Sequence, residues 1–282
     1  GRLFWEKNMK MQDTSRRKKY VTKILVCLAS LMFLLLTGCT EELVTGGEIQ
    51  QTDSGGANVS AQSAKSDDDL YKDAVKDAMT IEDEEILPVI SLEKGEPYAT
   101  YNEEGSKILL ITCHDMPEFY QEGKAVTLKK DGVWTFTGGE MADWYAVEMK
   151  DLRDPGKRFR QLLGLAPDSS YTYYSAIWVD REDILRPAYV PDIAETAMTD
   201  SFSGSVDVAY KDWFDDQIIN SYFDGQRPWT RLGYTYDWSE GNGREYGLSE
   251  FYVKGGSQVD VEYTCTREKF EQKLKNGTWD VR

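Results

Sequence analysis

The first 38 residues carry the strongest signal in the sequence, and they decide which part of the chain is left to fold. A basic stretch (Arg16–Lys19, then Lys23) precedes an apolar run from Ile24 to Leu36. The run has 13 residues, whereas a helix needs about 20 to cross the hydrocarbon core of a bilayer. A basic region before a short apolar run is instead the layout of a secretory signal. We therefore expect residues 1–38 to be cleaved off and the fold to come from the remainder. Residues 1–8 precede the first methionine and are interpreted as an over-extended start or added sequence.

The apolar run ends in Leu36-Thr37-Gly38-Cys39. This tetrapeptide resembles the lipobox of bacterial lipoprotein precursors. The resemblance implies that a diacylglyceryl group is attached to the Cys39 sulfur, that the signal is cut before Cys39, and that the new N-terminus is acylated. It therefore implies a protein on the outer face of the cell membrane, held there by lipid.

Residues 39–66 read as a flexible tether between the lipid and a folded domain. From Thr45 to Ser66 the chain consists largely of Gly, Ser, Gln, Ala and Thr, which cannot bury enough apolar surface to fold. A flexible linker of this length has an end-to-end distance of roughly 30 Å. The folded part is expected over residues 67–282 as a single domain, with a small N-terminal lobe over 67–140 as the alternative.

The charge of the mature chain excludes one class of partner. Removing residues 1–38 takes away eight basic and two acidic side chains, which leaves 25 basic and 47 acidic ones and a net charge of about −22. Such a charge repels nucleic-acid phosphates, so no nucleic-acid partner is expected. The predicted partners are the membrane, through the lipid, and a cell-envelope glycan or another envelope protein.

The hydrophobic pattern favours an α+β fold with a largely antiparallel sheet, hairpins and a few packed helices. Helices are expected from Asp67, where Asp67–Asp69 offer N-caps, and over 155–163, 207–223 and 267–275. Strands are expected over 98–101, 107–113, 125–129, 133–137, 171–179, 231–238, 247–253 and 258–264. The Asp131-Gly132 pair between two of these strands is a hairpin signal. Gly164 is expected to stop the second helix.

The mature domain contains two cysteines, Cys113 and Cys265, and one histidine, His114. Both cysteines continue the inward face of a predicted strand, so two alternatives stand: a disulfide outside the cytoplasm, or two buried thiols. His114 is expected to end a strand and bond to nearby backbone. Two cysteines and one histidine offer no zinc-type spacing, and no metal or cofactor is predicted.

The run Pro228-Trp-Thr-Arg-Leu-Gly-Tyr-Thr-Tyr-Asp-Trp238 is the richest segment. Strand alternation predicts a buried face with Tyr234 and Tyr236 and a solvated face with Arg231 and Asp237. Aromatic rings can stack on sugars, and charged groups can bind hydroxyls. The candidate binding face comprises Trp229, Arg231, Asp237, Trp238, Glu250 and His114. The alternative is that the aromatics only fill the core.

A second resemblance covers roughly residues 106–265. A family of bacterial proteins to which no activity is assigned has segments that resemble Leu109–His114, Arg160–Pro167, Trp178-Val179, Asp183–Pro187, Pro228–Trp238 and Gly247–Phe251. The resemblance therefore implies no catalytic role.

Catalytic signatures such as Gly-x-Ser-x-Gly, His-Glu-x-x-His or a P-loop are absent from the sequence. We therefore expect a binding or structural envelope lipoprotein. The alternative is a glycan-processing or other hydrolytic enzyme that uses Asp237 and Glu250 in an aromatic-lined cleft.

Overall fold

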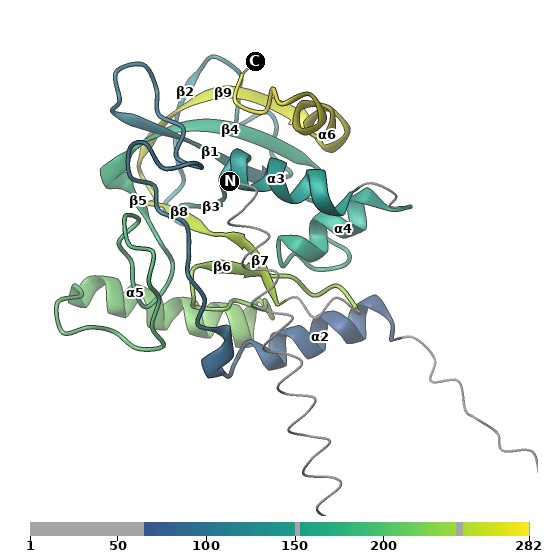
Figure 1. The fold of residues 1–282 in the computed structure, drawn as a ribbon, viewed down its shortest axis with the longest axis vertical. Helices are drawn as coiled ribbons and strands as arrows, with labels where there is room; N and C mark the ends of the chain where they lie inside the picture. Colours follow the sequence, from purple (N-terminus) through teal and green to yellow (C-terminus); the bar gives the residue numbers. More distant parts are fainter. Residues whose placement is uncertain (1–64, 150–152, 241–244, 282) are drawn as a thin grey trace, which may run out of the picture.

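The structure is a computed structural model that describes residues 65–149, 153–240 and 245–281 (Figure 1). The predicted signal, the lipidation site Cys39 and all but the last two residues of the predicted tether lie outside the described residues. Among the described residues, no helix is both long enough and apolar enough to cross a membrane.

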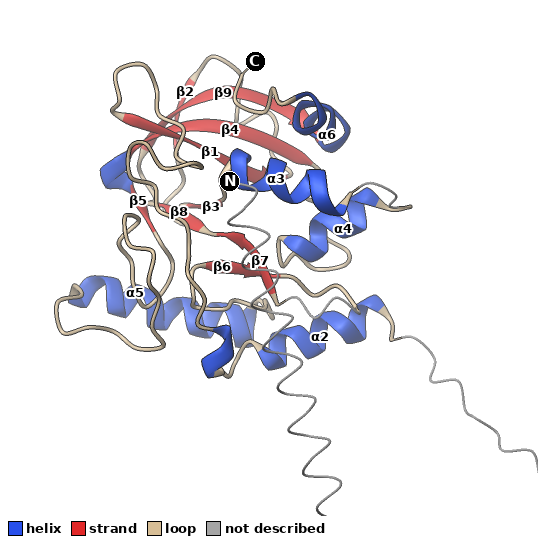
Figure 2. Ribbon diagram, viewed as in Figure 1, coloured by secondary structure: helices blue, strands red, loops and turns tan. Residues whose placement is uncertain are grey.

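The described residues form an α+β fold in which all paired strands are antiparallel, as the sequence predicts (Figure 2). The largest sheet has the order β1-β4-β9-β2, a second has the order β3-β8-β5, and β6 pairs with β7 alone. The strands are β1 (Lys107–His114), β2 (Ala125–Thr127), β3 (Val133–Thr135), β4 (Tyr173–Asp180), β5 (Ile184–Leu185), β6 (Tyr234–Tyr236), β7 (Tyr246–Ser249), β8 (Phe251–Val253) and β9 (Gln258–Thr266).

The four strands of the largest sheet lie close to strand ranges that the sequence predicts. Strand β9 alternates buried and partly exposed residues along its length, with Val259, Val261 and Tyr263 buried. This period of two matches one face packed on a core. Strands β1 and β4 pair over their full lengths, from Lys107 opposite Asp180 to His114 opposite Tyr173.

The hairpin predicted around Asp131-Gly132 is wrong. The turn itself forms, because Gly132 has φ of 62° and its N–H donates to the Lys129 carbonyl at 3.0 Å. However, β2 pairs with β9 and β3 pairs with β8, so the two flanking strands belong to different sheets. The turn residues fix a reversal of the chain, whereas burial of each strand's apolar face selects its partner.

The helices begin and end largely where capping residues predict. They are α2 (Asp67–Asp77), α3 (Gly138–Glu148), α4 (Pro155–Leu162), α5 (Val208–Ile219), continued by a π-helical turn (η3, Asn220–Asp224), and α6 (Arg267–Asn276). Short 3₁₀ turns η1 (Asp83–Glu85) and η2 (Arg181–Asp183) complete the set. The N-cap of α2 is Ser66, whose Oγ accepts from the Asp69 N–H at 3.2 Å, and not one of the aspartates. Helix α3 is not predicted by the sequence.

An aromatic cluster joins the small β6–β7 sheet to α2 and α5. Its buried members include Tyr71 on α2, Phe214 on α5, Trp229 and Tyr236. In Figure 1, α2 and α5 lie at the end of the molecule away from β2 and β9, and β6 and β7 lie between. The aromatic-rich segment 228–238 therefore packs where α2, α5 and the β6–β7 sheet meet, and a cavity opens at the same place.

Candidate functional site

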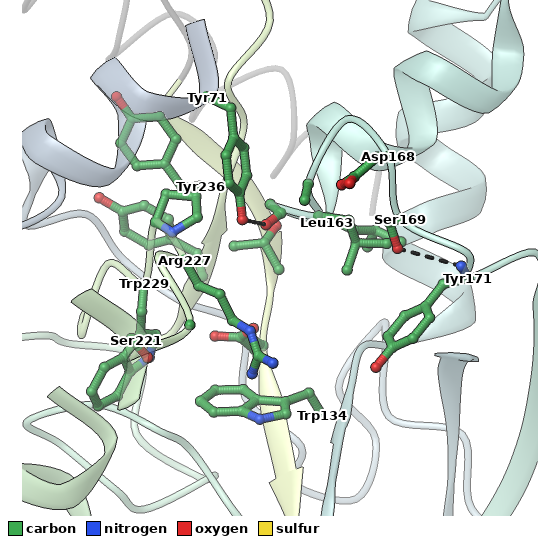
Figure 3. Close-up of a pocket in the computed structure, with 18 of the residues that line it drawn as sticks. Tyr71, Trp134, Leu163, Asp168, Ser169, Tyr171, Ser221, Arg227, Trp229 and Tyr236 are labelled. Carbon is green, nitrogen blue, oxygen red and sulfur yellow. Dashed lines mark hydrogen bonds between the residues drawn. The ribbon is translucent and has the colours of Figure 1, made fainter. Parts of the chain in front are cut away.

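A cavity of about 470 Å³ opens beside strand β6 (Figure 3). A volume of this size is within the range of small-molecule sites. Six of its 19 lining residues are aromatic, and three, Asp168, Arg227 and Glu250, carry an acidic or a basic side chain. The lining residues are Tyr71, Trp134, Leu163, Gly164, Leu165, Ala166, Asp168, Ser169, Ser170, Tyr171, Ser221, Gly225, Arg227, Pro228, Trp229, Tyr234, Thr235, Tyr236 and Glu250.

The cavity wall is assembled from segments far apart in the sequence. Figure 3 shows Tyr71 from α2, Arg227 from the segment after η3 and Tyr171 from the loop before β4 around the same space. Gly164 ends α4 with φ of 63°, which turns the chain into that loop. The hydroxyl of Tyr71 lies 3.5 Å from the Gly164 carbonyl oxygen. Glycine is suited to this position because φ is positive.

Two indole rings form a corner of the cavity. The rings of Trp134 and Trp229 lie 6.0 Å apart between centroids, at 76° to each other. Behind them, Trp134 also contacts Trp213 and Tyr252, with centroid distances of 6.4 and 5.7 Å. The contacts of Trp134 with Trp229 and Tyr252 are edge-to-face, and such contacts hold rings in fixed orientations. Nε1 of Trp229 is buried and lacks a hydrogen-bond partner among the described atoms. The corner is therefore rigid, and it retains one unused N–H donor.

Glu250 is the partly buried acid of the cavity. It lies between β7 and β8, where its N–H donates to the Gly233 carbonyl at 2.9 Å. Within the part of the chain that the structure describes, its carboxyl group makes no hydrogen bond or ion pair. Burial raises the pKa of Glu250 to about 8, because the charged form loses hydration without gaining a partner. Glu250 is thus a lone carboxyl group facing a ligand-sized space.

Asp168 and Arg227 are the other charged side chains of the cavity wall, and both are exposed. Burial also raises the pKa of three wall tyrosines, to about 12 for Tyr71 and further for Tyr234 and Tyr236. These phenols therefore remain neutral donors at physiological pH. Ser169 is already engaged locally, since its Oγ accepts from the Tyr171 N–H at 3.3 Å.

The predicted solvated face of the 231–238 strand is wrong. Asp237 is 2% exposed, and its carboxylate accepts from Nη1 and Nη2 of Arg158 on α4 at 2.9 and 2.6 Å. The β6 strand is covered on both sides, by α2 on one and by α4 on the other, so alternation no longer separates core from solvent. Asp237 does not line the cavity, and its carboxylate is committed to Arg158.

Arg231 and Trp238 also lie outside the cavity. Arg231 has φ of 62°, so its side chain leaves the strand direction, and Nη2 donates to the carbonyls of Ala78 and Met79, each at 3.0 Å. Its guanidinium lies over the Tyr222 ring. Trp238 is buried, and its indole N–H donates to the Leu165 carbonyl at 2.9 Å. Both side chains stabilise the fold. Of the predicted face, only Trp229 and Glu250 line the cavity.

His114 has the structural role that the sequence predicts. Its Nδ1 accepts from the Met116 backbone N–H at 3.0 Å, so the proton is on Nε2, which lies 2.7 Å from Ser175 Oγ. The ring is 3% exposed, and burial lowers the pKa of His114 to about 4. His114 is therefore a neutral, fully bonded side chain at the end of β1.

Cys113 and Cys265 are both free thiols, so of the two alternatives the structure has separate thiols and not a disulfide. Each stands opposite Tyr174, Cys113 from β1 and Cys265 from β9. Strand β4 thus separates them, and two inter-strand spacings place their Cα atoms about 9–10 Å apart. A disulfide requires less than about 7 Å. Burial raises the pKa of the thiols to about 12 and about 11, respectively.

One group of carboxylates could approach a metal ion. Oxygens of Asp77, Glu85 and Glu245 lie within 4.8 Å of one another. The Tyr236 hydroxyl donates to Asp77 at 2.8 Å, which ties this cluster to the back of the cavity wall. Glu85 and Glu245 have other interactions of their own. The cluster is thus a partly satisfied acidic group, separate from Glu250.

Sequence reasoning missed Tyr71, Trp134, Arg227 and Asp168 as cavity residues. None of the four belongs to the aromatic-rich segment 228–238, and each reaches the cavity only through the tertiary fold. The fold and the cavity define an α+β protein with an aromatic-lined, ligand-sized site. No protein-family model matches this chain, and no curated protein or solved structure is significantly similar to it. The function is therefore argued from the site itself.

Proposed function

We propose that this protein is a bacterial lipoprotein, anchored to the outer face of the cell membrane through Cys39, whose folded domain binds a ligand in the aromatic-lined cavity. The anchoring part is supported by the basic stretch, the 13-residue apolar run and the tetrapeptide ending at Cys39. The tether over residues 39–66 would hold an acidic domain away from anionic headgroups.

The binding part is supported by one observation: a cavity of about 470 Å³ is lined by Trp134, Trp229 and Glu250, whose carboxyl group has no hydrogen bond or ion pair among the described residues. Aromatic walls with a few polar groups are typical of sites for small molecules. The ligand would be a small molecule, or a projecting group of a cell-envelope glycan or protein.

The hydrolytic alternative has less support. Glycoside hydrolysis of the usual kind needs two carboxyl groups flanking the scissile bond. Asp237, the intended partner of Glu250, has both oxygens bonded to Arg158 and does not line the cavity. The remaining carboxylate on the wall, Asp168, is exposed. A binding role therefore accounts for the geometry better than paired acid–base catalysis does.

Metabolic labelling with a fatty-acid probe tests the anchoring part. Cys39→Ala should lose the label and accumulate uncleaved precursor, because the thiol that accepts the lipid is gone. Cys113→Ala, a thiol inside the folded domain, serves as the control and should label like the parent. Equal labelling of Cys39→Ala and the parent would contradict lipidation at this residue.

Saturation-transfer NMR tests the binding part, with the domain from Lys65 onward and a panel of neutral sugars, amino acids and organic amines. Tyr171→Ala should weaken any observed binding severalfold with little loss of stability, because Tyr171 lines the cavity yet is 40% exposed. Phe223→Ala removes another exposed ring, 68% exposed, that does not line the cavity, and should have no effect. Equal effects of both changes would show that the ligand binds elsewhere.

A further inference from the structure

We propose that the cavity binds the ammonium group of an organic cation, held between the indole corner of Trp134 and Trp229 and the carboxylate of Glu250. This inference rests on the proposed function, namely that the cavity is a ligand site, and it adds the chemical class of the ligand. It uses three features of the cavity: a carboxyl group without a counter-charge, aromatic faces beside it, and an acidic molecule around it.

The first feature is the isolation of Glu250. A carboxylate withdrawn from water is costly unless a cation or several N–H donors compensate for the lost hydration. No such partner contacts Glu250 in the described part of the chain, and the raised pKa is the consequence. A cation that enters the cavity would supply the missing charge. By contrast, Asp237 in the same region already has its own partner, Arg158.

The second feature is the aromatic corner. The faces of indole and phenol rings carry negative potential and attract ammonium groups within about 6 Å of the ring centre. Trp134 and Trp229 meet at 76°, so they present two walls to the same space. Neighbouring rings fix both orientations, so little ordering is needed when a ligand binds.

The third feature is the charge of the molecule. The mature chain carries 25 basic and 47 acidic side chains, so its long-range field attracts cations and repels anions. Arg227 is the lone basic side chain among the residues that line the cavity, and it is exposed, so its charge is screened by water. A neutral sugar would use the rings but would not compensate for ionisation of Glu250, whereas a cation would.

Isothermal titration calorimetry with choline, and with its neutral isostere 3,3-dimethyl-1-butanol, tests the inference at pH 6 and pH 9. Burial raises the pKa of Glu250 to about 8, and it raises the pKa of Tyr71 to about 12 and those of Tyr234 and Tyr236 further. Asp168 and Arg227 are the other charged groups facing the cavity, and Asp77, Glu85 and Glu245 lie behind Tyr236. Choline should bind at least tenfold more tightly at pH 9 than at pH 6, because binding requires ionised Glu250, and it should bind more tightly than the alcohol at pH 9.

Glu250→Gln, which keeps the size of the side chain, should lower choline affinity at pH 9 at least tenfold and abolish the pH dependence. Glu104→Gln, in the turn before β1, removes the same charge outside the cavity. It should leave the choline affinity and its pH dependence unchanged. Circular dichroism of each variant confirms that the fold is retained.

Choline that binds no more tightly than the alcohol, or binds Glu250→Gln as well as the parent, would overturn the cation assignment. If the alcohol or a neutral sugar binds while choline does not, the cavity remains a ligand site and only the cation assignment fails. If choline, the alcohol and the whole panel of sugars, amino acids and amines fail to bind, the binding function itself is wrong.

Discussion

Arg158 and Asp237 form a buried two-point ion pair that joins α4 to the end of β6. Nη1 and Nη2 of the guanidinium donate to the two carboxylate oxygens at 2.9 and 2.6 Å, and the side chains are 7% and 1% exposed. The guanidinium also lies 4.9 Å from the centre of the Trp144 ring. The Asp237 carboxylate additionally accepts from the Ser239 N–H at 3.1 Å. These bonds satisfy the buried charge, and they fix the strand that carries one side of the cavity.

The first prediction is that Asp237→Asn destabilises the domain by about 3–5 kcal/mol, because it leaves the Arg158 charge buried without a counter-charge. Asp260→Asn breaks an ion pair with Lys107 whose carboxylate is 48% exposed, and it should cost less than about 1 kcal/mol. Urea denaturation measures the free energy of unfolding of both variants. If the two variants lost similarly small amounts of stability, the buried ion pair of Arg158 and Asp237 would be contradicted.

The second prediction separates the ring of Tyr236 from its hydroxyl. The ring belongs to the aromatic cluster with α2, and the hydroxyl donates to Asp77 at 2.8 Å. Tyr236→Ala should cost about 3 kcal/mol or more through the cavity that it leaves, whereas Tyr236→Phe should cost about 1 kcal/mol through one hydrogen bond. Thermal denaturation distinguishes them. If Tyr236→Phe were as damaging as Tyr236→Ala, the bond to Asp77 would dominate and the packing account would be wrong.

The third prediction concerns the close approach of β7 to its neighbours. A Cβ on Gly247 would lie 2.1 Å from Thr235 Oγ1 and 2.4 Å from the Leu162 carbonyl oxygen. Gly247→Ala should therefore cost about 1–3 kcal/mol or more, since backbone must move. Gly204→Ala meets nothing within 4 Å and should stay within about 0.5 kcal/mol of the parent. Chemical denaturation compares the free energies of unfolding of the two variants. If Gly247→Ala were as stable as the parent, the close packing of Gly247 against Thr235 and Leu162 would be wrong.

The fourth prediction concerns pH. Glu140 on α3 is fully buried, accepts from the Ser249 N–H at 2.8 Å, and has its pKa raised by burial to about 7. The folded state thus holds this proton more tightly than the unfolded state. The stabilisation that protonated Glu140 contributes to the folded state is therefore complete below about pH 4.5 and is lost as pH rises through about 7.

Glu140→Gln keeps an acceptor for Ser249 and removes the titration. The fall in unfolding free energy between pH 5.5 and pH 8.5 should therefore be smaller in the variant than in the parent. The contribution of His114 has the opposite pH dependence. Burial lowers its pKa to about 4, so the stabilisation from neutral His114 is lost as pH falls below about 6.5. It contributes equally to both proteins and cancels in the comparison. An identical pH dependence in parent and variant would show that Glu140 does not titrate in this range.

The local features of the fold could be predicted from the sequence. The period of two in β9, the start of α4 at Pro155 and its stop at Gly164 each depend on residues a few positions apart. The α+β class follows from the order of such elements. Trp229 and Glu250 could also be named as site candidates, because an aromatic-rich strand and an acid in the next strand are visible in the sequence.

The long-range partners, by contrast, depend on how the elements pack in three dimensions. Asp237 finds Arg158, 79 residues away, and the β2 and β3 strands join β9 and β8 in place of each other. The cavity needs Tyr71 from α2 and Trp134 from β3 beside Trp229. Strand alternation states which side chains share a face, but not which faces will be covered. Here α2 and α4 cover both sides of β6, so the face that looked solvated became core, and Glu250 rather than Asp237 lines the cavity.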